Sequence, residues 1–221
     1  DAVWIPPSSK NRSSGYVGYA PFDHYDLGDK WQKGNTRTRL GTKDELLRMI
    51  AIMHANGIEV IQDVVLNHVN GAGSANGAGG YDPNSYSVAT NGGYKNFRYV
   101  SYNTSATAET QSNYWARNGR WPKNYTDFYP NANNNCTTGD ICAAYFGPDI
   151  SYESNSFGVS SNVVGHNPAQ TSNYMRNGGR DWITWMKKQT GVDGFRWDAV
   201  KHFPTYIQED YSYNLKYTLP T

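Results

Sequence analysis

Residues 42–66 read TKDELLRMIAIMHANGIEVIQDVVL, and this stretch decides the expected fold. Thr42, followed three positions later by Glu45, makes a capping box, which is typical of the start of a helix. Apolar residues then recur at helical spacing as far as Asn56-Gly57, a pair that favours the left-handed conformation ending a helix. We therefore predict a helix over residues 43–55. The apolar positions that carry it are Leu46, Ile50 and Met53.

The segment after this helix, residues 58–66, is rich in β-branched residues and too short for a second helix, so we predict a buried strand. Short apolar runs also precede the helix, which gives the order strand, helix, parallel strand. The same pattern resumes from about Thr171, where a helix that ends at Gly191 leads into another predicted strand, residues 192–200. The expected fold class is therefore α/β.

The middle of the chain differs from both flanks, because its periodicity disappears and Gly, Asn, Ser and Tyr take over. A structureless segment of that length is uncommon in a compact domain, so its aromatic residues predict an inserted, irregular, β-containing subdomain. We place the boundaries at 1–68, 69–169 and 170–221. The insertion lies between a strand and a helix, where α/β barrels carry their active-site loops. Its aromatic residues include Tyr94, Phe97, Tyr99, Tyr102, Trp115, Trp121, Phe128, Tyr129, Tyr145 and Phe146.

The composition excludes several classes of protein. Hydrophobic residues make up 38% and charged residues 18% of the 221, a balance that excludes general disorder. Lys and Arg number 20 against 19 Asp and Glu, a formal net charge of +1, so we expect no nucleic acid partner. Crossing a bilayer takes an apolar run of about 18 residues. The sequence holds no such run, and we expect no membrane association.

Cys136 and Cys142 lie close together in a stretch of Asn, Thr and Gly. Three interpretations stay open for them: a local disulfide, two unpaired thiols, or a metal site, although zinc usually needs four ligands. A disulfide would imply an oxidising compartment.

Polar side chains lie where the predicted strands end. Arg196 and Asp198 are two positions apart and therefore share one face of their strand. A guanidinium beside a carboxylate keeps the carboxylate ionised, which suits a nucleophile and equally suits a structural ion pair. Two strands of one sheet bring several more polar residues to the same rim, and that convergence favours a functional site. The converging residues are Asp63, Asn67, His68, Arg196, Asp198, Lys201 and His202.

Two segments carry these converging residues: DVVLNH at 63–68 and GFRWDAVKH at 194–202. They resemble the first two signature segments of the α-amylase family of glycoside hydrolases, and three further segments match the family in the same order along the chain. The resemblance implies a partial (β/α)8 barrel with about strands two to four of eight, into which domain B is inserted at 69–169. It also implies retaining endo-hydrolysis of α-1,4-glucosidic bonds in starch, glycogen and maltooligosaccharides. The supporting segments are GYAPFDHYDLG at 18–28, KGNTRTRLGT at 33–42 and GPDI at 147–150.

The resemblance also implies roles for single residues. Asp198 would be the nucleophile that forms a glycosyl-enzyme, with Arg196 holding it charged and oriented. Tyr19 would stack on the sugar and His68 would bond its hydroxyls. Taken without the family pattern, Tyr19 is an ordinary loop tyrosine and His68 a satisfied histidine at a strand end. The residues implied to contact substrate are Tyr19, His68, Asp63, Lys201 and His202.

A structural calcium ion is a further implication of the resemblance. Asn67, Asp149 and the main-chain carbonyl of His202 match the family's ligand positions. Such hard oxygen ligands suit Ca²⁺, and an ion there would tie the insertion to the barrel. Asp140 is either a further ligand or a turn residue.

A retaining glycosidase also needs a second carboxyl group as acid and base, roughly 5 Å from the nucleophile. The resemblance implies a glutamate on the next barrel strand, whereas Glu209 comes too early and lies on the following helix. We therefore expect this glutamate beyond Thr221, the 221 residues alone to be inactive, and the full-length protein to be a secreted monomer. Two alternatives stay open: a transglycosylase on the same scaffold and a non-catalytic starch-binding relative.

Overall fold

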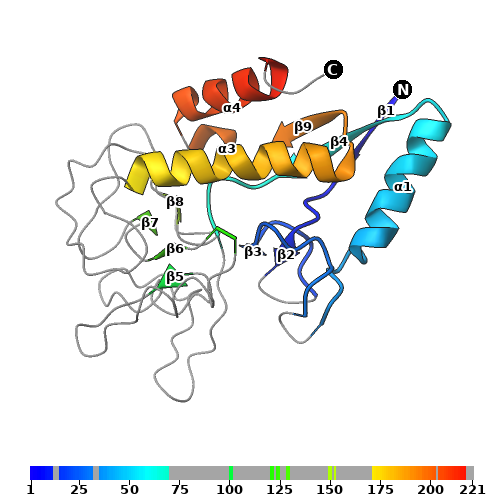
Figure 1. Ribbon diagram of the computed structural model, residues 1–221, viewed down its shortest axis with the longest axis horizontal. Helices are drawn as coiled ribbons and strands as arrows, with labels where there is room; N and C mark the ends of the chain where they lie inside the picture. The colour runs from blue at the N-terminus through cyan, green and yellow to red at the C-terminus, as the bar shows by residue number, and fades with distance from the viewer. Residues whose placement is uncertain are drawn as a thin grey trace.

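The computed structural model describes residues 1–11, 15–31, 35–69, 100–101, 120–121, 123–124, 128–129, 149–150, 152, 171–202 and 204–217. Its elements are short strands and longer helices, with the helices packed around a small parallel sheet (Figure 1). In chain order they are β1 (Ala2–Ile5), β2 (Lys10–Asn11), β3 (Pro21–Asp23), α1 (Lys43–Ala55), β4 (Glu59–Val64), β5 (Val100–Ser101), β6 (Lys123–Asn124), β7 (Phe128–Tyr129), β8 (Asp149–Ile150), α3 (Thr171–Thr190), β9 (Gly194–Trp197), the 3-10 helix η4 (Val200–His202) and α4 (Thr205–Tyr217).

Within the described residues, the central sheet has three strands in the order β1-β4-β9, all parallel. This confirms the predicted order of strand, helix and parallel strand. The register pairs Asp63 of β4 with Arg196 of β9. The ladder runs one residue past β9, because Asp198 N donates to Val64 O at 2.9 Å. The carboxyl ends of β4 and β9 therefore meet at one edge of the sheet.

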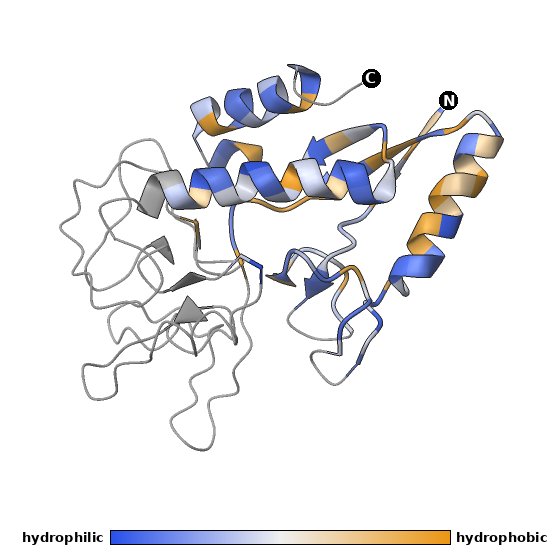
Figure 2. Ribbon diagram, in the orientation of Figure 1, coloured by the Kyte–Doolittle hydropathy of each residue, from blue (hydrophilic) through white to orange (hydrophobic). Residues whose placement is uncertain are grey.

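Helix α1 spans the predicted residues, and both halves of its capping box form. Thr42 Oγ1 accepts from Glu45 N at 3.3 Å, and Glu45 Oε2 accepts from Thr42 N at 2.8 Å. Gly57 follows the helix with φ +69°, the left-handed conformation expected after its end. In Figure 2 apolar residues run along much of this helix, and Ile50 from it packs against Val60 of β4.

Both predicted strands are shorter in the structure than in the sequence pattern. β4 occupies 59–64 of the predicted 58–66, and β9 occupies 194–197 of the predicted 192–200. β9 cannot extend through Ala199, because that residue has φ +51° and turns the chain out of the sheet. A side-chain pattern does not reveal such a turn, since Ala gives no turn signal.

The main core lies between the sheet and helices α3 and α4. Trp182, Ile183 and Met186 of α3 are buried there with Ile207 and Tyr211 of α4. The viewer-facing side of α3 is mostly hydrophilic in Figure 2, as expected for a helix with one face on the core. The predicted helix that ends at Gly191 is confirmed, because α3 ends at Thr190 and Gly191 has φ +73°.

Among the described residues of the segment predicted as an insertion there are four short strands. β5 pairs with β6 in parallel and β7 pairs with β8 in antiparallel fashion. Ile150 of β8 donates its N–H to Asn67 O at 2.7 Å, and Tyr152 Oη donates to Leu66 O at 2.9 Å. These two bonds attach the segment to the end of β4. The division at 69 and 169 stays a prediction, and Asp140, Cys136 and Cys142 lie outside the described residues.

No helix in the described part of the chain combines the length and the apolar character needed to cross a bilayer.

Candidate functional site

One guanidinium joins the ends of β4 and β9. Arg196 Nη1 donates to Asp198 Oδ1 at 2.7 Å and to Asp63 Oδ1 and Oδ2 at 3.2 and 3.1 Å. The register puts Asp63 directly beside Arg196, and Asp198 follows two residues later on the same face. The predicted pairing of Arg196 with Asp198 is therefore present, and it includes a second carboxylate.

The two carboxylates differ in exposure. The side chain of Asp63 is fully buried, whereas that of Asp198 is 21% exposed. Asp198 is also the one carboxylate among the residues that line a cavity of about 410 Å³. A ligand in this cavity would therefore meet Asp198, and the predicted substrate contact of Asp63, which does not line the cavity, stays a prediction. The lining residues are Tyr19, Arg196, Trp197, Asp198, Ala199, Val200, Lys201 and His202.

Tyr19 joins the cluster from the segment before β3. Its Oη donates to Asp63 Oδ2 at 2.8 Å. Burial, together with that hydrogen bond, raises the pKa of Tyr19 to about 12, so the phenol stays a donor at neutral pH. Burial also raises the pKa of Asp63, and the hydrogen bonds from Tyr19 and Arg196 oppose this rise. Asp63 is thus held between two donors, and its role in the structure is to position Arg196 and Tyr19.

The pKa of Arg196 is raised by the same contacts. Burial by itself lowers the pKa of the guanidinium, and the hydrogen bonds to Asp198 and Asp63 outweigh that effect. Trp4 of β1 adds a third contact, because its ring lies 5.2 Å from the Arg196 guanidinium carbon. Arg196 therefore stays charged and is held on three sides.

His68 is buried and bonded on both ring nitrogens. Its Nε2 donates to Tyr19 O at 3.0 Å, and its Nδ1 accepts from Asn67 Nδ2 at 3.3 Å. Burial lowers the pKa of the ring, which agrees with this neutral arrangement. His68 thus fixes the segment that carries Tyr19. The predicted contact of His68 with a sugar stays a prediction, as does that of Lys201 and His202, which line the cavity from η4.

The expected calcium ligands are described only in part. The bond from Ile150 N to Asn67 O brings β8, and with it Asp149, beside buried Asn67. The side chain of Asp149 and the whole of Asp140 lie outside the described residues. In the described part of the chain no three His, Cys, Asp or Glu side chains group as a metal site. The expected ligand set differs from such a group, because it includes an amide oxygen and a main-chain oxygen.

A second cavity of about 430 Å³ lies beside α1 and is mostly apolar, with Leu27, Leu46 and Met49 in its wall. Its one lining carboxylate, Glu45, is engaged in the capping box. We therefore assign the candidate site to the cavity at Asp198.

Three features of this region have no signal in the sequence pattern. The contact of Trp4 with Arg196 is one, because no periodic pattern reports how β1 and β9 align on the two sides of β4. The turn at Ala199 carried no residue signal. The third feature is Lys10, a buried lysine in a run of polar residues that gave no sign of burial.

Comparisons with known proteins show the family to which the chain belongs. The family model described as Alpha amylase, catalytic domain, matches residues 1–216. Among curated proteins, the glucan 1,4-alpha-maltohexaosidase of Bacillus sp. (strain 707) is 30% identical over 214 residues, which cover 95% of this chain and 40% of that protein. The alpha-amylase of Bacillus licheniformis is 30% identical over 217 residues, with the same coverage of 95% and 40%.

Among solved structures, an alpha-amylase from Malbranchea cinnamomea aligns with a TM-score of 0.52 at 21% identity, covering 94% of this chain and 33% of that one. This likeness shows that the fold is shared. The chain spans about 40% of the length of the two curated relatives. Because the family model covers nearly the whole chain, these residues belong to the alpha-amylase family, as a part of its catalytic domain.

Proposed function

We propose that the protein containing this chain hydrolyses α-1,4-glucosidic bonds in starch, glycogen and maltooligosaccharides, with retention of anomeric configuration. One observation carries the proposal: Asp198, bonded to Arg196 at 2.7 Å, faces a cavity of about 410 Å³ that Tyr19 also lines. A nucleophile must be ionised, oriented and open to substrate. Arg196 orients Asp198, and the exposure of the Asp198 side chain opens it to substrate.

In the proposed reaction, an Asp198 oxygen attacks the anomeric carbon as the leaving-group oxygen takes a proton from a second carboxyl group. The resulting glycosyl ester is then hydrolysed by water, which that same group activates as a base. The positive charge of the oxocarbenium-like transition state is stabilised by the carboxylate beside it. We propose that the acid/base glutamate follows Thr221, and that the 221 residues alone are inactive.

The other cavity residues are proposed to bind the glucan. Tyr19 offers an aromatic face on which a sugar ring can stack, and Asp63 and His68 fix its position. Lys201 and His202, which follow Asp198 in the sequence, would contact the next glucose. The lining is mostly apolar surface, and it combines aromatic rings with charged side chains, which supports a carbohydrate ligand that presents both apolar ring faces and hydroxyls.

Asp198→Asn in the full-length protein tests the proposal. We expect release of reducing sugar from starch to fall about 10⁴-fold, because the amide removes the attacking anion while its size is unchanged. Glu209→Gln is the matched control, since Glu209 lies exposed on α4, and it should retain activity. Activity that survives Asp198→Asn would remove Asp198 as the nucleophile. Linear products would favour hydrolysis, and cyclic or lengthened products would favour transfer to a sugar acceptor.

We further propose that residues 1–68 and 170–221 form strands two to four of a (β/α)8 barrel, with domain B at 69–169. The parallel order β1-β4-β9 and the shared α-amylase fold support this arrangement. We propose a structural Ca²⁺ held by Asn67, Asp149, the His202 carbonyl and Asp140, a set made wholly of oxygen donors. Secretion and a monomeric state belong to the same proposal. Cell fractionation and sedimentation of the full-length protein test them.

A further inference from the structure

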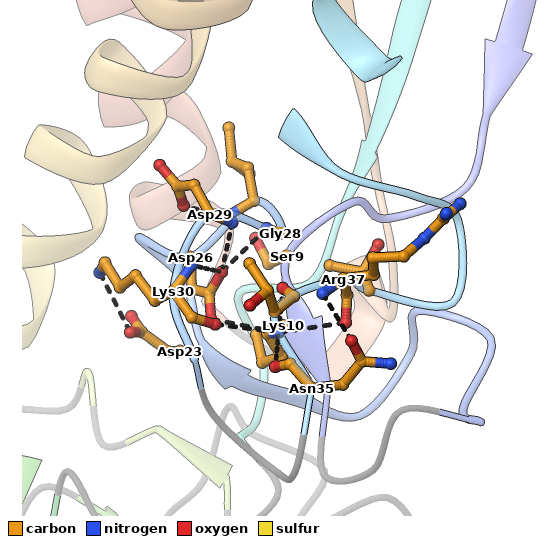
Figure 3. Close-up of polar contacts among 12 residues, drawn as sticks. Ser9, Lys10, Asp23, Asp26, Gly28, Asp29, Lys30, Asn35 and Arg37 are labelled. Carbon is orange, nitrogen blue, oxygen red and sulfur yellow. Dashed lines mark hydrogen bonds and ion pairs between the residues drawn. The ribbon is translucent and has the colours of Figure 1, made fainter. Parts of the chain in front are cut away.

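Lys10 carries a buried ammonium and is not among the residues that line the proposed glucan site. The residue lies in β2, is 1% exposed, and its Nζ points into the segment between β3 and α1 (Figure 3). Four main-chain carbonyls of that segment accept hydrogen bonds from Nζ, and one carboxylate lies beside them. The oxygens are those of Thr36 at 2.6 Å, Asn35 at 2.9 Å, Arg37 at 3.1 Å and Lys30 at 3.3 Å, with Asp26 Oδ2 at 3.5 Å.

The number of oxygens exceeds what a lysine needs. An ammonium has three N–H bonds to donate, while five oxygens stand within 3.5 Å of Nζ. Carbonyl oxygens gathered around one centre are the means by which proteins replace the hydration shell of a monovalent cation such as K⁺. The carboxylate of Asp26, which is fully buried, supplies the compensating negative charge. The shell therefore resembles a cation site more closely than an ordinary lysine contact.

The carboxylate is held in place without help from the ammonium. Asp26 Oδ1 accepts from the backbone N–H groups of Gly28 at 2.8 Å, Asp29 at 3.2 Å and Lys30 at 3.3 Å (Figure 3). Lys10 itself is anchored by its backbone, since Lys10 N donates to Asp26 O at 2.7 Å. The turn that presents Oδ2 would thus persist if the side chain of residue 10 lost its charge.

We infer that Asp26 Oδ2 and the four carbonyls form a binding site for a monovalent cation of ammonium or potassium size, and that Lys10 fills this site with its own ammonium. The occupant is attached to β2, so it links β2 to the segment before α1. Removing the side chain of Lys10 leaves the shell vacant and with a net negative charge. A free cation of the right size can then enter the shell.

Chemical rescue of Lys10→Ala in the full-length protein tests this inference. Ala leaves the position of Nζ open, whereas the methyl group of Met would lie too close to it for a free cation. We expect the melting temperature to fall by about 5 °C or more, because a buried carboxylate loses its partner cation. Ammonium or potassium chloride should restore part of that loss, and tetramethylammonium chloride at equal ionic strength should not, since it is too large for the shell. Lys30→Ala is the matched control: the Lys30 side chain is 40% exposed and its ammonium pairs with Asp23 outside the carbonyl shell, so no cation-specific rescue is expected.

A second variant keeps the test decisive. In Lys10→Ala/Asp26→Asn, the amide oxygen can still accept the turn's hydrogen bonds while the charge is gone, so rescue by ammonium should weaken at least tenfold in concentration. If Lys10→Ala does not fold on expression, it is refolded in ammonium chloride and in tetramethylammonium chloride, and soluble yield replaces melting temperature. Equal rescue by all three salts, or no change in stability on Lys10→Ala, would overturn the inference.

Discussion

At the residue scale, two carboxylates that bond the same guanidinium differ in their exposure. Arg196 bonds both Asp63 and Asp198, yet only Asp198 reaches the cavity. The turn at Ala199 contributes to this difference, because φ +51° ends the strand directly after Asp198 and leaves its carboxylate at the edge of the sheet. For a non-glycine residue that conformation costs about 1 kcal/mol. The site thus stores a small backbone strain at the proposed nucleophile.

Asp210 on α4 gives a prediction of pH dependence at the same scale. Burial raises the pKa of Asp210, and the bonds from Arg176 and Arg180 more than offset this, so its pKa lies below its usual range. A lowered carboxyl pKa adds stability above the unfolded value near 3.9, and that stability is lost as the pH falls through the folded value.

We therefore expect Asp210→Asn to lower the free energy of unfolding by about 1–2 kcal/mol at pH 7. The expected loss is modest because both arginines are about one third exposed, so that water screens their charges. Urea unfolding at pH 7 and near pH 3 measures the difference between wild type and variant, which should shrink at the lower pH. The neighbouring Glu209→Gln serves as control. A difference that is independent of pH would contradict the assigned charge interaction.

At the element scale, α3 and α4 pack closely because α3 carries glycine where α4 presents an aromatic ring. Gly179 is buried, and a Cβ there would overlap Oη of Tyr211. That hydroxyl donates to Arg176 O at 2.8 Å, so the ring cannot withdraw without breaking the bond. The sequence pattern predicted the helix correctly, but a glycine inside it reads only as a weak helix former.

Gly179→Ala is expected to destabilise the protein. Ala in place of Gly would ordinarily stabilise a helix by about 1 kcal/mol, and overlap in a packed core costs about 1–3 kcal/mol. The overlap with Tyr211 is deep and the ring is rigid, so we expect the second effect to prevail. Thermal unfolding measures the change. Asn177→Ala, at an exposed position of the same helix, should raise stability slightly, and a stabilised Gly179→Ala would show that α4 can move away.

At the scale of the whole molecule, residues far apart in the chain meet at the end of β4. Tyr19, Asp63 and Arg196 come from three separate segments, and Ile150 and Tyr152 attach the strands β7 and β8 to the same end through Asn67 and Leu66. A cation placed beside Asn67 would strengthen that attachment, because it would bind oxygens from both sides. Its loss would therefore affect the stability of the molecule and not only its activity.

Removal of calcium from the full-length protein is expected to lower its melting temperature. Binding to the folded state adds stability that grows with the ratio of free ion to Kd, and a chelator removes this contribution. Calorimetry with excess Ca²⁺, with chelator, and with Mg²⁺ measures the effect, and Mg²⁺ should restore little. Asn67→Ala should make the protein less sensitive to the chelator. Identical melting curves with Ca²⁺ and with chelator would refute the proposed calcium site.

Local sequence was sufficient for α1, for the end of α3 and for the position of β4. The capping box at Thr42 and the stop at Asn56-Gly57 determined both ends of α1, because the interactions that start and end a helix lie within a few residues. The β-branched run predicted β4, and two residues of one strand face, Arg196 and Asp198, were predicted to be neighbours. These features depend on the fixed side-chain periods of helices and strands. The spacing of residues in the sequence shows those periods directly.

Tertiary structure alone decided which polar side chains line the cavity and which are buried. The register of Asp63 beside Arg196, the ring of Trp4 over the guanidinium and the burial of Lys10 all join residues distant in sequence. Such contacts depend on how strands align and segments close on one another, which is set by the packing of the entire core. The chain by itself thus determined its helices, its strands and its reactive residue types, and packing determined their exposure, their partners and their charge environment.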